Sequence, residues 1–348
     1  MINIRVPFVA ALALLFVSGF SVAREQLQIV GSSTVYPFAS FVAEEFGALS
    51  RYPTPVVEAT GTGGGIKIFC AGNGMELPDI VNASRRIRIM EMQLCRRNGV
   101  SNITEVMFGY DGIVLAQNAD MPPLKLTMHE LLLALAKMVP NESGNGLVEN
   151  TYTHWNQINP ALPDRKITIY GPPISSGTRD SFEEIVLEVQ TEKMKVYRDA
   201  GLKGYRVIRT DGVFVPAGEN DNLIVQKLTK DRNAMGIFGY SYLAENSDII
   251  QSIAIDDVSP STRTIASKEY PIARSLFFYV KNDHHQQLPA LREYIDMFMS
   301  PEIIGENGLL VDIGLIPMQD DLITRYRQRA EAREVLDIRQ LERTLAAH

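Results

Sequence analysis

Cysteine, histidine and tryptophan are scarce in this 348-residue chain, which contains two, five and one of them. The two cysteines are far apart and the histidines are scattered, so no spacing typical of metal ligands is present and no metal site is expected. The chain also lacks a Gly-Lys-Ser/Thr phosphate loop and a dinucleotide-binding fingerprint. We therefore expect neither a metal nor an organic cofactor.

The chain has fewer basic than acidic residues. Lysine and arginine number 34 against 41 acidic residues, which gives a formal net charge of −7. No basic stripe with interleaved aromatic residues is present, so a nucleic-acid partner is not expected. Beyond the N-terminus, no stretch approaches the roughly 18 apolar residues of a membrane span, which predicts a soluble chain. The length and the 45% hydrophobic content suffice for two domains with real cores.

The N-terminal segment has the pattern of a secretory signal peptide. Arg5 precedes an apolar run over residues 6–20, and Ser21-Val-Ala23 supplies the small residues of a cleavage site. We predict a signal peptide over residues 1–23, a mature chain that starts near Arg24, and a periplasmic location. The alternative is an uncleaved membrane anchor.

An exported chain can form disulfide bonds, and Cys70 and Cys95 are the only cysteines. We expect one disulfide between them. In the chain-entropy model a closed loop of about 25 residues contributes roughly 3–4 kcal/mol. The alternative is two buried free thiols.

Three segments rich in glycine and hydroxyl residues each follow a strand pattern and precede a helical one: Gly31-Ser-Ser-Thr34, Gly61-Thr-Gly-Gly-Gly65 and Ser175-Ser-Gly-Thr178. A helix N-terminus presents unpaired N–H groups and a positive dipole end. Glycine lets the backbone approach a ligand closely. Three such turns around one point would bind a tetrahedral oxyanion. Taken singly, the second is also typical of a flexible turn and the third of a helix N-cap without a ligand.

Arg85 and Arg179 each adjoin a predicted turn. A guanidinium fork suits a phosphate or sulfate dianion, although ordinary surface arginines are the alternative. An enzyme would need a nucleophile such as Ser33 or Ser176. Neither lies in a Gly-x-Ser-x-Gly elbow, no histidine is nearby in sequence, and no two-metal set is present. We therefore expect a binding protein rather than an enzyme.

Strands alternate with helices along the chain, which predicts an α/β fold. Residues 320–346 are charged and free of glycine and proline, which predicts a C-terminal helix. This helix packs on the body of the protein or docks on a partner, and the sequence leaves both open.

Four strings resemble the periplasmic phosphate-binding proteins of phosphate ABC transporters: Val30-Gly-Ser-Ser-Thr-Val-Tyr-Pro37, Gly61-Thr-Gly-Gly-Gly-Ile-Lys67, Asn82-Ala-Ser-Arg85 and Ser176-Gly-Thr-Arg-Asp-Ser-Phe182. Shorter strings at residues 109–112, 270–274 and 276–279 are similar as well. The resemblance extends from about Leu27 to Pro317. The helix predicted after Met318 has no counterpart in it.

The resemblance implies a hinged, two-lobed type II binding-protein fold with a central mixed sheet in each lobe. One lobe would hold residues 24–112 plus 273–348 and the other residues 113–272. Inorganic phosphate would bind between the lobes and pass to a membrane ABC permease, and the protein would be a monomer. The implied phosphate-binding residues are Ser33, Thr34, Val35, Thr62, Gly63, Ser84, Arg85, Ser176, Gly177, Thr178 and Arg179.

The chain departs from the family pattern at three places. Val35 stands where family members carry a hydroxyl residue, and Pro172 stands where they carry an arginine. Ser84 stands where they carry an aspartate. Arg85 and Arg179 are expected to compensate for the lost arginine. Selectivity stays open, so sulfate, molybdate or a phosphorylated solute is the alternative ligand, and a secreted phosphoesterase is a further alternative.

Overall fold

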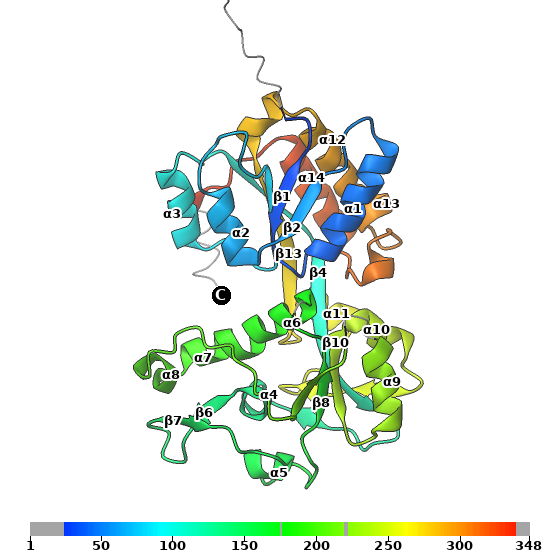
Figure 1. Cartoon of the computed structure of the whole chain (residues 1–348). Coiled ribbons are helices and arrows are strands. Elements are labelled where there is room, and N and C mark those ends of the chain that lie inside the picture. Colours follow the sequence, from blue (N-terminus) through cyan, green and yellow to red (C-terminus); the bar gives the residue numbers. More distant parts are fainter. Residues whose placement is uncertain (1–23, 175, 219–221, 339–348) are drawn as a thin grey trace, which may run out of the picture.

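The protein is described here by a computed structural model that covers residues 24–174, 176–218 and 222–338. The predicted signal peptide lies outside the described residues. The chain forms two lobes, and two long strands run from one lobe to the other (Figure 1). These strands are β4 (Ile103–Asn118) and β13 (Ala273–Lys281).

The first lobe, drawn uppermost in Figure 1, combines the N-terminal and C-terminal parts of the chain. Its other strands and its helices are β1 (Gln28–Gly31), α1 (Tyr36–Leu49), β2 (Val56–Ala59), α2 (Thr62–Phe69), β3 (Ile80–Ala83), α3 (Ile89–Arg97), the 3-10 helix η2 (Asn282–Gln286), α12 (Ala290–Phe298), α13 (Pro301–Ile304), the 3-10 helix η3 (Val311–Ile313) and α14 (Asp320–Glu331).

The second lobe is built from the middle of the chain. Its strands are β5 (Lys125–Leu126), β6 (Met138–Pro140), β7 (Leu147–Glu149), β8 (Ile169–Gly171), β9 (Phe214–Pro216), β10 (Met235–Gly239), β11 (Ile250–Ser252) and β12 (Ala254–Ile255). Its helices are α4 (Met128–Leu135), α5 (Trp155–Ile158), α6 (Gly177–Phe182), the π-helix η1 (Glu183–Glu188), α7 (Val189–Lys193), α8 (Lys195–Asp199), α9 (Asn222–Lys230), α10 (Tyr240–Glu245) and α11 (Thr262–Ala266).

The main sheet is mixed and continues through both lobes, in the order β2-β1-β3-β13-β4-β10-β8-β9. Strand β1 is parallel to β2 and β3, whereas β13 is antiparallel to β3 and β4. Residues 103–112 of β4 pair with β13, and residues 113–117 pair with β10. One strand therefore belongs to the sheets of both lobes.

Burial along β4 marks the crossing between the lobes. Every residue of this strand is buried except Asp111, which is half-buried. A strand that is covered on both faces has a nearly continuous run of apolar residues in its sequence. The more accessible Asp111 is followed by Gly112, whose register partner is Ala273 at the start of β13.

Aromatic side chains fill the core of the first lobe. Phe108 of β4 lies between Phe278 of β13 and Phe298 of α12, with ring centroids 6.2 Å and 5.0 Å away. The helical spacing in α1 buries Phe38 and Phe46 toward the same core. Burying these rings gives the lobe its main hydrophobic stabilisation.

The predicted C-terminal helix is shorter than expected. Helix α14 ends at Glu331, and Arg333 has a positive φ of 52°. The chain then extends along β4, where Val335 bridges Thr104 and Leu336 donates its N–H to the Ile103 carbonyl at 2.8 Å. Burial of Leu336 and this pairing stop the helix. The remainder of the prediction, residues 339–346, lies outside the described residues.

No helix in the described part of the chain combines the length and the apolar character that crossing a bilayer requires.

Candidate functional site

The first predicted turn joins β1 to α1. Gly31 has a φ of +131°, and a Cβ there would lie 2.8 Å from the Asn82 nitrogen, so only glycine fits. Thr34 is buried at 6% exposure. Its hydroxyl accepts a hydrogen bond from Arg274 Nη2 at 2.9 Å and donates to the Gly177 carbonyl at 3.2 Å. Thr34 therefore contacts a residue that lies 143 positions later in the chain.

The second turn precedes α2 and packs against the first. Gly61 caps the helix with a φ of +71°. A Cβ on Gly65 would lie 2.9 Å from the Gly31 nitrogen, so the helix backbone lies directly on the first turn. The Thr62 hydroxyl lies 3.0 Å from the Ser84 hydroxyl and accepts the Ser84 N–H at 3.2 Å.

The third turn belongs to the second lobe and touches the first turn. Ser176 is the N-cap residue of α6. A Cβ on Gly177 would lie 2.7 Å from the Thr34 nitrogen and still closer to the Ser33 carbonyl. Ser181, one turn further along α6, has its hydroxyl against that of Thr34. Figure 1 shows α6 at the edge of the second lobe that faces the first.

Arg85 is held by Glu91. Its Nη1 and Nη2 atoms donate to the two carboxylate oxygens at 2.9 Å and 2.7 Å, a bidentate pair. Burial disfavours the charge of Arg85, but the hydrogen bond and charge of Glu91 outweigh it and raise the pKa of the guanidinium. Arg85 therefore stays cationic at the face between the lobes.

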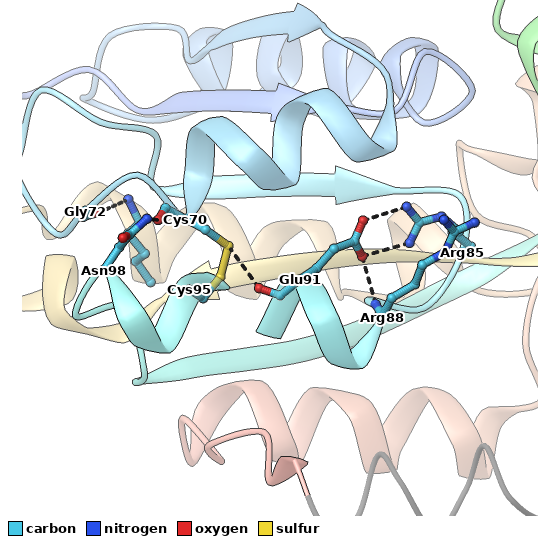
Figure 2. The surroundings of a disulfide bond; sticks show 8 residues. Cys70, Gly72, Arg85, Arg88, Glu91, Cys95 and Asn98 are labelled. Carbon is cyan, nitrogen blue, oxygen red and sulfur yellow. Dashed lines mark hydrogen bonds and ion pairs between the residues drawn. A yellow bond between two sulfur atoms is a disulfide. The ribbon is translucent and has the colours of Figure 1, made fainter. Parts of the chain in front are cut away.

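A disulfide fixes the helix that carries Glu91. Cys70, at the end of α2, is bonded to Cys95 in α3, as expected from the sequence. Glu91 lies about one turn before Cys95 in the same helix, and its carbonyl oxygen lies 3.8 Å from the Cys70 sulfur (Figure 2). The disulfide thus anchors one end of α3 while the other end orients Arg85.

Arg274 is a buried cation that the sequence arguments did not assign to the site. It is 7% exposed and is the second residue of β13, at the crossing between the lobes. Its Nη1 lies 3.3 Å from Glu184 Oε2 and its Nε lies 3.7 Å from Asp111 Oδ2. Burial raises the pKa of Asp111, and the charge of Arg274 opposes this shift. The only sequence signal for Arg274 was its place in the string Tyr270–Arg274.

Acidic residues line the face of the second lobe. Asp180 pairs with Arg206, Glu183 pairs with Arg179, and Glu184 contacts the first lobe. The structure adds a π-helical turn over η1, a rare conformation that is frequent at functional sites.

The predicted residues divide between two cavities on the interlobe face. Thr62, Gly63 and Arg85 line one of about 420 Å³. The other, of about 550 Å³, is lined by Ser33, Thr34, Ser176, Gly177 and Thr178. Gly177 contacts Ser33 and Thr34 of the first turn, and all three residues line this second cavity. The three turns therefore meet at one interlobe face without enclosing a single cavity.

Three predicted residues line neither of these two cavities. Val35 is fully buried, with its N–H 3.4 Å from the Ser32 hydroxyl. Ser84 is buried behind Thr62. Arg179 lies 4.1 Å from the Phe214 ring centroid and donates to Glu183. Their roles in binding stay predictions. No cluster of histidine, cysteine or acidic side chains in the described residues has a metal-holding arrangement.

Comparison with known proteins identifies the family. A model described as "PBP superfamily domain" matches residues 19–302. The chain belongs to the PBP superfamily. Its membership agrees with the two-lobed α/β architecture and confirms the fold class predicted from the sequence.

Two relatives and one solved structure place the chain within the PBP superfamily. Protein SphX of Synechocystis is 31% identical over 89% of this chain and 84% of its own length. The phosphate-binding protein PstS of Staphylococcus haemolyticus is 28% identical over 76% of this chain and 73% of its own length. A possible phosphate binding protein from Planctomyces limnophilus superposes with a TM-score of 0.71 at 28% identity, covering 89% of this chain and 98% of that one.

Proposed function

We propose that this protein captures inorganic phosphate between its two lobes and delivers it to a membrane ABC permease. The observation that carries the proposal is the contact of the third turn with the first, Gly177 against Ser33 and Thr34. This contact brings helix N-termini from both lobes to one face, where backbone N–H groups and hydroxyls can replace the hydration of an oxyanion. The names of PstS relatives support phosphate as the ligand.

The binding residues are those predicted from the turns, together with Arg274. Arg274 contributes because it touches Thr34 of the first lobe and Glu184 of the second. Guanidinium groups and unpaired amides together suit a multiply charged tetrahedral anion. Arg85 supplies a second guanidinium at the same face.

The lobes are residues 24–112 plus 273–348 and residues 113–272, and they move about the two strands that cross between them. The register pair Gly112 and Ala273 supports this boundary, because β4 changes its partner from β13 to β10 there and β13 begins there. Closure over the anion is the change that the permease reads. The protein acts as a monomer in the periplasm after removal of residues 1–23, and it performs no catalysis.

Equilibrium binding to phosphate-stripped protein tests the function. Calorimetry with phosphate should give micromolar or tighter affinity, and competition with sulfate decides between the two anions. Thr178→Val keeps the side-chain shape and removes the hydroxyl. Because a hydrogen bond to a charged group contributes roughly 1.5–3 kcal/mol, we expect the affinity to fall about 10- to 100-fold.

Thr178→Ser is the matched control, because it retains the hydroxyl and should bind nearly as well as the wild type. Failure of the stripped protein to bind phosphate would reject the function. Equal affinity of Thr178→Val and the wild type would remove Thr178 from the site without rejecting the function.

A further inference from the structure

Glu184 connects the two lobes through a single carboxylate. Its Oε1 lies 3.3 Å from Nε of Arg85, and its Oε2 lies 3.3 Å from Nη1 of Arg274. All three side chains are largely buried, with exposures of 13%, 20% and 8% for Glu184, Arg85 and Arg274. We call these three residues the interlobe ion cluster. Charges at this depth interact more strongly than on the open surface.

Both guanidinium groups have another acid close by. Arg85 is already paired bidentately with Glu91, and Arg274 lies 3.7 Å from Asp111. Each arginine therefore has a counter-charge besides the Glu184 carboxylate.

The cavity beside the interlobe ion cluster has more acids than bases. Its charged lining consists of Arg85, Arg88, Arg206, Glu91, Asp180, Glu184 and Glu188. Burial raises the pKa of Glu188, and the negative charge of Glu184 raises it further. The negative charge of Glu184 thus repels the Glu188 carboxylate and also attracts the two arginines.

One further group at this face lacks a hydrogen-bond partner in the described part of the chain. This group is the buried Thr60 hydroxyl. Thr60 lines the same cavity as Glu184. A buried donor without an acceptor is costly, so an oxygen-rich ligand would find an unsatisfied donor here.

We propose that Glu184 is an internal competitor of the anion: its carboxylate occupies Arg85 and Arg274 and joins the lobes until phosphate replaces it. This inference rests on the proposed function and adds a residue that limits affinity. A bound phosphate either displaces the carboxylate, losing two ion pairs, or lies beside it and is repelled. In both cases the negative charge of Glu184 opposes binding. Glu184 lies in the π-helical turn η1.

Glu184→Gln tests the inference, because it removes the charge and retains the side-chain size. We expect inorganic phosphate to bind about tenfold more tightly, measured by calorimetry on stripped full-length protein. A residue with a merely structural role would give weaker binding. Without phosphate, small-angle X-ray scattering should give a larger radius of gyration for Glu184→Gln than for the wild type, because the lobes lose an ionic contact.

Asp199→Asn is the matched control. Asp199 also belongs to the second lobe, but its ion pair with Lys195 is exposed and lies within one helix, so its neutralisation should leave both measurements near wild type. Glu184→Asp is the second variant. It withdraws the carboxylate by one methylene and should give a smaller gain in affinity.

Unchanged or weaker phosphate binding by folded Glu184→Gln would overturn the inference, as would failure of both Glu184 variants to fold. The proposed function fails separately, if the wild type does not bind phosphate. In that case the scattering comparison still decides whether Glu184 joins the lobes.

Discussion

Asp111 and Arg274 face each other in the register of β4 and β13, at the point where these strands cross between the lobes. Asp111 Oδ2 lies 3.7 Å from Arg274 Nε, and Arg274 also contacts Thr34 and Glu184. A charged pair thus lies inside the proposed hinge. Removing one partner of a buried pair leaves the other charge uncompensated.

The pH dependence of stability should report on Asp111. Its pKa is raised by burial, so the folded state binds a proton more tightly than the unfolded state. This tighter proton binding stabilises the folded state at pH values below the ordinary aspartate pKa. The stabilisation is lost as the pH rises through the raised pKa of Asp111. The unfolding free energy of the wild type should therefore fall over that window relative to Asp111→Asn. Denaturant unfolding across the acid range measures the difference, and a difference that is flat or of opposite slope would contradict the assignment.

Gly177→Ala should weaken phosphate binding about 5- to 150-fold. The added methyl would lie 2.7 Å from the Thr34 nitrogen and would force the two turns apart. Overpacking of this kind costs roughly 1–3 kcal/mol. Calorimetry measures the affinity, and scattering at saturating phosphate should show a larger radius of gyration than in the wild type.

Gly239→Ala is the control for this prediction. Gly239 lines the same cavity, and a Cβ there has its nearest neighbour, the Ser241 hydroxyl, at 3.9 Å. It should bind phosphate with nearly wild-type affinity. If both alanine variants behave alike, the Gly177 contact does not control closure.

Replacement of both cysteines by serine should destabilise the protein by about 3–4 kcal/mol, because the 25-residue separation sets the entropy of the open loop. Denaturant unfolding of the oxidised wild type and the double serine variant measures this. Reduction of the wild type should reproduce the loss, whereas reduction of the variant should change nothing. Equal stability of oxidised wild type and variant would refute the estimate.

His285 should make the protein sensitive to moderate acid. Burial, and then the charges of Arg333 and Arg292, lower its pKa to about 4. The unfolded chain binds the proton near pH 6.5, so stability is complete above that value and falls as pH drops toward 4. The full effect would be roughly 3 kcal/mol, reduced by solvent screening. The difference in unfolding free energy between the wild type and His285→Gln should shrink over this window, and a constant difference would exclude the effect.

Local chemistry in the sequence determined much of the fold and of the turns. Gly31 and Gly61 occupy positive-φ positions that other residues avoid, so the predicted turns had a steric basis. Alternating strand and helix patterns predicted the α/β class, and the only two cysteines left one possible disulfide. These features depend on neighbours in the chain or on composition, so one sequence suffices for them.

Tertiary structure alone decided which turns touch and what surrounds the arginines. The contact of Thr34 with Gly177 spans 143 residues, and that of Arg274 with Glu184 spans 90. No periodicity of a single helix or strand encodes such distances. The end of α14 was fixed in the same way, by pairing of Val335 with the distant β4. The sequence supplied donors and charges, but only the packing of the two lobes set an acid between two arginines, because the energy of a buried charge depends on what the folded chain places beside it.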